Sequence, residues 1–210
     1  MSPAIEELRQ QLRDRFPAAH APLRPVPSPE PAPEPLVFQS YPAGGLSEIV
    51  TPEGRSPLGL LVAGWLGEPD HALAFPDLVL VDGSDSLDPD SLGGNACSRL
   101  LWVRCSSAMD LIKAGELLIR DGNLPTILLD AAGLPLRSLR QIPASAWWRL
   151  KQAAEDHGCR VICLSPQPLI PCAAMRLSLS ADFSLDDLYL SRREVLPRLH
   201  AKTERLRMAN

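Results

Sequence analysis

Short apolar runs alternate with helical stretches along most of this chain. Five runs of four or five residues consist mainly of apolar side chains and end at a polar or turn-forming residue. Such a run is typical of a strand buried on both faces of a parallel sheet. Strands of this kind alternating with helices predict an α/β domain with a mostly parallel, twisted sheet flanked by helices. The predicted strands are Leu46–Val50, Asp77–Val81, Leu100–Val103, Thr126–Leu129 and Val161–Leu164.

Helical periodicity and capping residues place the helices between these strands. Three helices are predicted. The first is Leu58–Leu66, and the second is an apolar stripe that begins after the capping-box spacing from Ser107 to Asp110. The third is Pro143–Asp156, which ends before Gly158. Met175–Leu179 is predicted as an edge strand. Ser184 and Asp187 are placed to cap a further helix that begins near Leu185.

The ends of the chain differ from its middle and suggest four regions. Residues 1–16 have the apolar spacing of a short amphipathic helix, which either packs back on the domain or docks on a partner. Residues 17–42 form a proline-rich linker, with seven prolines from Pro22 to Pro35. The core is expected at residues 43–190, and residues 191–210 form a basic tail.

Composition narrows the class of protein. The chain has 210 residues and a formal net charge of -4, which argues against a surface that coats nucleic acid generally. It contains no apolar run long enough to cross a bilayer and no signal-peptide core, so a cytoplasmic protein is expected. Its five cysteines and four histidines show no metal-binding spacing. The cysteines are interpreted as small, mostly buried thiols, and no metal is expected.

The loop after the first strand is the first candidate site, because a phosphate-binding loop lies between a strand and a helix. Such a loop needs glycines to wrap phosphate oxygens, a lysine for the terminal phosphates and a serine or threonine for magnesium. The residues at this position are Pro52, Glu53, Gly54, Arg55, Ser56, Pro57 and Leu58.

The segment around this loop resembles the RecA family, with Glu48-Ile49, Pro52 and Glu53 matching its pattern. The resemblance implies a single RecA-like domain, but the chemistry of the loop departs from the family. Thr51 and Ser56 stand in place of its glycines, Pro57 in place of its lysine and Leu58 in place of its hydroxyl residue. Arg55 offers a positive charge only from a different position. The phosphate loop is therefore degenerate, and no cofactor is expected.

The loops after the predicted strands Asp77–Val81 and Thr126–Leu129 lead to the same expectation. The segment Val81–Pro89 follows the RecA pattern, but Ser84 occupies the position of the glutamate that activates water. A neutral serine is a poor proton acceptor. Asp130 stands where the family's magnesium-orienting aspartate lies, and is interpreted as a vestigial carboxylate that caps its own loop. After the predicted strand Val161–Leu164, Ser165-Pro166 replaces a polar Asn-Gln pair of the family. No catalytic residue is therefore assigned, and the chain is predicted to be a pseudo-ATPase rather than an enzyme.

Within the RecA-like proteins, four segments resemble the ImuA group of accessory proteins of damage-induced mutagenesis. They are Gly45–Ile49, Val81–Gly83, Arg99–Arg104 and Leu128–Asp130. The resemblance implies a role in the bacterial DNA-damage (SOS) response, in which translesion DNA synthesis is supported through protein–protein contacts. The implied partners are an ImuB-like relative of the Y-family polymerases and an error-prone polymerase subunit.

Two alternatives remain open at this point. Gly45–Ile49 and the helix after it also resemble SulA, a RecA-fold inhibitor that blocks polymerisation of the division protein FtsZ. The segment Asp82–Pro89 and Asp130 favour the ImuA group over SulA. A divergent ATPase with an unorthodox loop is the other alternative.

Candidate contacts with a partner or with DNA lie near the C-terminus and on one helix. Six cationic and two acidic residues follow residue 190, so this segment is either solvated or binds phosphates or an acidic protein. Of the paired tryptophans, one ring should face the core and the other is a candidate partner anchor. The candidate residues are Arg192, Arg193, Arg198, Lys202, Arg205, Arg207, Trp147 and Trp148.

Overall fold

A computed structural model describes Glu7 and residues 40–51, 56–66, 76–92, 94–181 and 183–206. The chain divides into two units, Met1–Pro31 and Ala32–Asn210. In the first unit only Glu7 is described, as an exposed helical residue. The rest of the predicted helix at 1–16, most of the linker at 17–42, the loop residues Pro52, Glu53, Gly54 and Arg55, and Arg207 lie outside the described residues.

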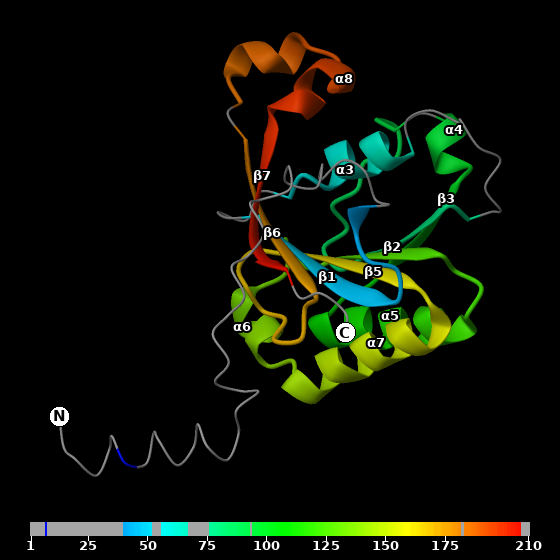
Figure 1. The fold of residues 1–210 in the computed structure, drawn as a ribbon. Coiled ribbons are helices and arrows are strands. Elements are labelled where there is room, and N and C mark those ends of the chain that lie inside the picture. The colour runs from blue at the N-terminus through cyan, green and yellow to red at the C-terminus, as the bar shows by residue number, and fades with distance from the viewer. Residues whose placement is uncertain are drawn as a thin grey trace. The chain divides into compact units, whose positions relative to one another are not determined.

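A seven-stranded sheet forms the centre of the second unit (Figure 1). Its order is β3-β2-β4-β5-β1-β6-β7, in which neighbouring strands are parallel up to β6, and β7 is antiparallel to β6. The predicted α/β class with a mostly parallel sheet flanked by helices is confirmed, and it is consistent with a single RecA-like domain. The strands are β1 (Gly45–Val50), β2 (Leu78–Asp82), β3 (Leu100–Arg104), β4 (Thr126–Asp130), β5 (Arg160–Ser165), β6 (Met175–Ala181) and β7 (Leu199–Leu206).

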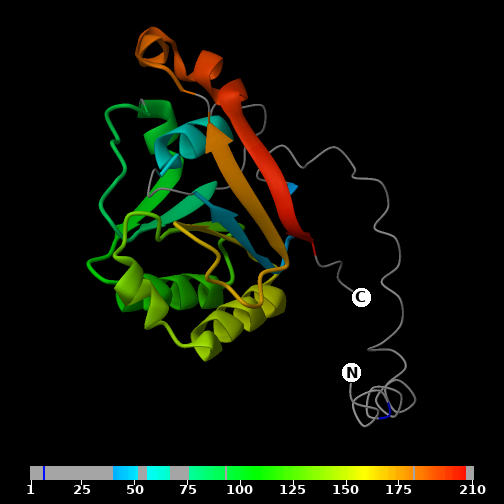
Figure 2. The ribbon, with the colours of Figure 1, turned by 90° about the vertical axis from the view of Figure 1, so that its left-hand side faces the viewer.

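Helices cover both faces of the sheet, as Figures 1 and 2 show. One face is covered by α3 (Leu58–Trp65) and α4 (Gly94–Cys97), and the other by α5 (Ala108–Asp121), α6 (Leu136–Arg140) and α7 (Ala144–His157). Between β6 and β7 the chain forms η3 (Leu185–Tyr189), α8 (Arg192–Val195) and η4 (Leu196–Arg198).

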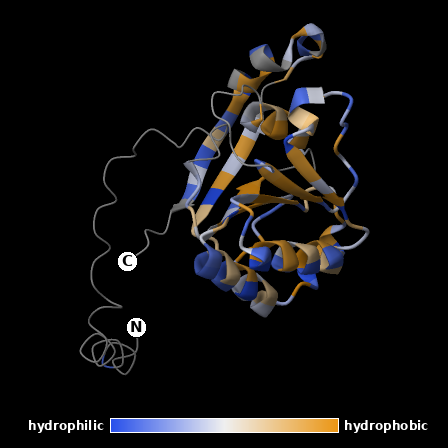
Figure 3. Cartoon of the chain, turned by 90° about the vertical axis from the view of Figure 1, so that its right-hand side faces the viewer, coloured by the Kyte–Doolittle hydropathy of each residue, from blue (hydrophilic) through white to orange (hydrophobic). Residues whose placement is uncertain are grey.

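Two hydrophobic clusters form because side chains alternate across the strands. In β2, Val79 and Val81 join the cluster under α5 and α7, whereas Leu78 and Leu80 join the cluster under α3. Figure 3 shows the apolar residues of the central strands and the mixture of polar and apolar residues along the helices of the α5–α7 layer. All five residues of β2 are buried, which explains why the strand has a continuous apolar run.

The longest helices begin and end at residues suited to those positions. Ser107 caps α5 by accepting a hydrogen bond from the backbone N–H of Asp110 at 3.1 Å, as its spacing predicts. Gly122 ends α5 and Gly158 ends α7, each with a left-handed backbone (φ of 76° and 64°). Glycine adopts this conformation without steric cost.

The C-terminal part of the core differs from the prediction in three ways. Met175–Leu179 does not form an edge strand, because β6 lies between β1 and β7. The segment predicted as a basic tail contains β7, so the sheet extends to Leu206 rather than ending at residue 190. The helix expected near Leu185 is a five-residue 3-10 helix, although the predicted capping box between Ser184 and Asp187 is present.

Among the described residues, no helix combines the length and the apolar character that crossing a bilayer would need.

Candidate functional site

The loops predicted to carry any chemistry meet at one edge of the sheet. In the strand register, Val50 lies beside Ser165, Leu164 beside Asp130 and Asp130 beside Asp82. The carboxyl ends of β1, β2, β4 and β5 therefore face the same side. Ligands of open parallel sheets bind at this edge, so it is the candidate site.

The described end of the phosphate loop is built into the start of α3. The Leu58 side chain is 1% exposed and belongs to the apolar cluster on the α3 face. Its backbone N–H donates to the Ser56 Oγ at 3.3 Å. The carbonyl of Pro57 accepts from the N–H groups of Leu60 and Leu61. Leu58, which the resemblance to RecA would place at a magnesium-binding hydroxyl, is therefore a core side chain.

Asp82, at the end of β2, organises the loop that follows it. Its carboxylate accepts hydrogen bonds from the backbone N–H groups of Ser84, Ser86 and Leu87 at 3.0–3.2 Å. The Trp102 Nε1 donates to the same carboxylate at 3.3 Å. Asp82 is fully buried, so these donors replace the water it lacks. Sequence reasoning assigned no role to this residue, although an aspartate directly after an apolar strand and before Gly-Ser is a recognisable loop-forming signal.

Asp130 caps the loop after β4, as its interpretation from sequence proposed. Its Oδ1 accepts from the backbone N–H of Ala132 at 3.0 Å, and its Oδ2 accepts from the Ser86 hydroxyl at 2.7 Å. Burial raises the pKa of this carboxyl, and the charge of Asp82 raises it further, while the two hydrogen bonds lower it. Both oxygens therefore already have partners within the chain.

Ser84, which the resemblance to RecA would place at the activating glutamate, lies against the loop after β4. A Cβ placed on Gly133 would be only 2.6 Å from the Ser84 Oγ, so the two loops are in close contact. Gly83 also has no space for a side chain, because an added Cβ would lie 2.8 Å from the carbonyl oxygen of Asp130. The Ser84 Oγ is buried and has no hydrogen-bond partner among the described residues. This packing leaves little room for a longer side chain at Ser84.

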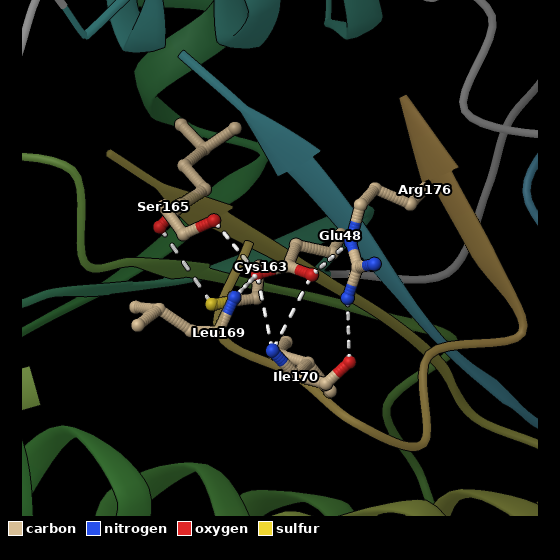
Figure 4. Close-up of polar contacts among 7 residues, drawn as sticks. Glu48, Cys163, Ser165, Leu169, Ile170 and Arg176 are labelled. Atoms are coloured by element: carbon tan, nitrogen blue, oxygen red, sulfur yellow. Dashed lines mark hydrogen bonds and ion pairs between the residues drawn. The ribbon is translucent and has the colours of Figure 1, made fainter. Parts of the chain in front are cut away.

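A second polar cluster, centred on Glu48 of β1, lies on the α5–α7 side of the same edge (Figure 4). Glu48 is fully buried, and its Oε1 accepts from the Ser165 hydroxyl at 2.9 Å and from the N–H of Leu169 at 2.7 Å. Its Oε2 accepts from the Arg176 Nε at 2.6 Å. The N–H of Ile170 is shared between both oxygens at 3.3 and 3.4 Å.

This cluster holds the crossover between β5 and β6. Residues 166–174 join two parallel strands without forming a helix, so their backbone groups lack regular partners. Glu48 accepts from two of their N–H groups, and the Arg176 Nη2 donates to the carbonyl of Ile170 at 2.7 Å. Glu48 matched the RecA pattern in the sequence, but in the structure it supports a loop. Arg176 was missed because nothing in its local sequence indicates a distant partner.

The predicted contact residues fall into two separate groups. Trp147 is buried (2% exposed) and Trp148 is 49% exposed on α7, as expected for one core ring and one free ring. The Lys151 ammonium lies 5.8 Å from the centre of the Trp148 ring. The basic residues lie instead along the C-terminal segment: Arg192 and Arg193 in α8, Arg198 in η4, and Lys202 and Arg205 in β7, which runs beside β6. Because α8 contacts α3 and α7 covers the opposite face, the structure does not unite them in one site.

Comparison of the sequence with family models and with curated proteins gave no match.

Proposed function

We propose that this chain is a non-catalytic, RecA-like accessory protein that acts in the cytoplasm during the bacterial DNA-damage (SOS) response. In this role it supports translesion DNA synthesis through protein–protein contacts. The main support for a non-catalytic protein is that side chains of the chain itself occupy the carboxyl edge of the sheet. Leu58 is in the core and Ser84 is packed against Gly133, at two positions where nucleotide hydrolysis needs a magnesium ligand and a base.

The remaining acidic groups at this edge also support a binding role. Asp82 and Asp130 direct their carboxylate oxygens at N–H and hydroxyl donors of their own loops. A carboxylate that orients magnesium must be free to face the ion and its water shell. Using either group for metal binding would require these loops to open and would leave their buried N–H groups without partners.

The first experiment measures nucleotide binding. The full-length chain is titrated with ATP and with ATP plus magnesium by isothermal titration calorimetry, and phosphate release is followed in parallel. We expect neither saturable binding nor hydrolysis. Magnesium-dependent ATP binding with hydrolysis that is lost in Asp130→Ala would instead identify a divergent ATPase.

The second experiment tests the partners that the resemblance implies. The purified chain is tested for binding to an ImuB-like polymerase relative, to an error-prone polymerase subunit and to FtsZ. We expect binding to one of the polymerase-associated proteins, and weaker binding in Trp148→Ala. Leu117→Ala is the matched control, because Leu117 is an apolar residue 73% exposed on the neighbouring helix α5. Binding to FtsZ alone, with inhibition of its polymerisation, would support the SulA-like alternative.

A further inference from the structure

Strands β6 and β7 carry polar side chains on one face of their antiparallel pair. In register, Ser178 lies beside Lys202 and Ser180 lies beside His200. The register shift between the two strands lies before Leu177, so these two cross-strand pairs belong to the regular stretch. The residues that alternate with them face the apolar cluster on the α3 side instead, and they are Leu177, Leu179, Leu199 and Ala201.

The side chains of these two pairs are accessible from solvent. Ser180, His200 and Lys202 are exposed, and Ser178 is half-buried. Among the described residues, none of the four side chains forms a hydrogen bond or an ion pair. Each pair therefore offers a hydroxyl donor beside an ammonium or imidazole N–H donor, which is a combination suited to an anion.

The spacing of the two pairs matches a chain of phosphates. Residues two apart in a strand are separated by about 6.8 Å along it. Successive phosphates of an extended nucleic-acid strand are separated by a similar distance. Each phosphate would accept from one hydroxyl and one nitrogen donor, and such contacts hold a nucleic-acid backbone without reading its sequence. Cationic residues after residue 190 outnumber acidic ones by six to two, so the segment that carries Lys202 attracts a polyanion although the whole chain is acidic.

Two exposed aromatic rings lie in the segment that joins these strands. Phe183, two residues after the end of β6, is 46% exposed, and Tyr189, at the end of η3, is 91% exposed. Figures 1 and 2 show this segment at the end of β6 and the start of β7, which is also the end where Ser180 and His200 lie. Aromatic rings beside a cationic path stack on the bases of single strands with little sequence preference. In a duplex the bases already stack on one another, so the rings favour a single strand.

We propose that this face of β6 and β7, with the segment that joins them, binds single-stranded nucleic acid. Successive phosphates bind at the two hydroxyl–nitrogen pairs, and bases stack on Phe183 and Tyr189. The site goes beyond the protein contacts of the proposed function and uses no residue of the carboxyl edge, so the two proposals are tested independently. An acidic polypeptide would offer carboxylates to the same donors but no bases to the rings, and the experiments separate these two ligands.

The first test measures binding of the full-length chain to labelled oligo-dT and oligo-U by fluorescence anisotropy, with a duplex of the same length and poly-glutamate as competitors. We expect both single strands to bind, the duplex to compete weakly and poly-glutamate not to compete. Lys202→Gln should weaken the binding of oligo-dT about fivefold and reduce the slope of log K against log salt by about 0.7, because one phosphate contact is lost. Lys113→Gln, at an exposed position on α5, is the matched control and should change neither. Glu204→Gln should strengthen binding, since it removes an exposed carboxylate from β7.

The second test separates stacking on the rings from contact with the phosphates. Tyr189→Ala should weaken the binding of oligo-dT by at least about fivefold, and it should not change the binding of a strand that lacks bases. Lys202→Gln should weaken the binding of both strands. Leu185→Ala is the matched control for Tyr189→Ala, because Leu185 is 82% exposed in the same segment and has no ring.

These variants change exposed side chains, so each should unfold at nearly the same temperature as the wild type. A chain that does not bind oligo-dT at low salt would overturn the proposal. So would competition by poly-glutamate or by the duplex as strong as that by unlabelled oligo-dT. Equal losses of binding in Leu185→Ala and Tyr189→Ala, or in Lys113→Gln and Lys202→Gln, would also contradict it.

Discussion

Ser47 and Ser165 place the same hydroxyl group inside the sheet with different hydrogen bonding. Both residues are fully buried, but the Ser165 hydroxyl donates to Glu48, whereas the Ser47 Oγ has no partner among the described residues. A buried hydroxyl without a partner costs free energy, and a bonded one contributes about 1 kcal/mol. Ser47→Ala should therefore raise the free energy of unfolding by about 1 kcal/mol, and Ser165→Ala should lower it by a similar amount. Urea denaturation of both variants measures this, and equal effects of the same sign would contradict it.

The Glu48–Arg176 pair offers a second test at this scale. Glu48→Gln keeps the shape of the side chain but leaves the Arg176 guanidinium, whose side chain is 15% exposed, without its counter-charge. Removing one partner of a buried ion pair costs about 3–5 kcal/mol, so urea denaturation should show a loss of this order. Glu116→Gln is the control, because the arginines that Glu116 contacts are 57% and 53% exposed. Its loss should stay below about 1 kcal/mol.

Asp130 makes stability depend on pH. Because burial raises its pKa, the folded chain binds a proton here more tightly than the unfolded chain does. The wild-type chain should therefore lose stability from this residue as pH rises from about 4, the pKa of an unfolded aspartate, through the raised value. Asp130→Asn does not titrate. We measure the free energy of unfolding of Asp130→Asn and subtract that of the wild type. This difference should be larger at pH 7 than at pH 4. A smaller difference at pH 7 would contradict a raised pKa of Asp130.

At the scale of elements, four of the strands that the sequence predicts, β1, β2, β4 and β5, are buried on both faces, whereas the predicted β3 lies at an edge and is half-buried. β2 and β4 show an unbroken apolar run because helices cover both of their sides. β7 lies at the edge, and only Leu199 and Ala201 face the cluster on the α3 side, while His200, Lys202 and Glu204 are exposed. Because charged residues dominate the segment that forms β7, its net charge predicts a solvated tail. The alternation of apolar and polar side chains from Leu199 to Lys202 would instead have indicated a strand.

Removing this segment should therefore affect folding as well as binding. Deletion of residues 191–210 removes β7, together with Leu199, which is 7% exposed, and the partly buried Leu196. Burying one leucine is worth about 1.5–3 kcal/mol, so the deletion should lower the free energy of unfolding by about 3 kcal/mol or more. Chemical denaturation of the truncated chain measures the loss. A truncated chain as stable as the full chain would show that the sheet ends before residue 190.

At the scale of the whole molecule, the sequence predicts the position of the candidate site in the fold but not the side-chain contacts within it. The predicted strand ends place the loops after β1, β2, β4 and β5 at one edge, because parallel strands carry their carboxyl ends to the same side. The contacts within that edge depend on residues distant in sequence, such as the hydrogen bond from Ser86 to Asp130 and the packing of Ser84 on Gly133. Local patterns carry no information about these pairs, so the roles of Ser86 and Arg176 emerged only from the structure.

This whole-molecule packing predicts that restoring family-like residues will not restore nucleotide chemistry. Leu58→Ser removes a side chain that is 1% exposed, and truncations of buried leucine cost about 2–5 kcal/mol. A glutamate at position 84 that kept the direction of the serine side chain would displace the loop at Gly133, because the Ser84 Oγ already lies 2.6 Å from where a Cβ on Gly133 would be. Thermal unfolding should show both variants to be less stable than the wild type, and calorimetry should detect no ATP binding to either. Leu117→Ser is the control for Leu58→Ser and should leave stability nearly unchanged, because Leu117 is 73% exposed. A stable Ser84→Glu variant that gains magnesium-dependent ATP hydrolysis would show that the edge still has room for the reaction.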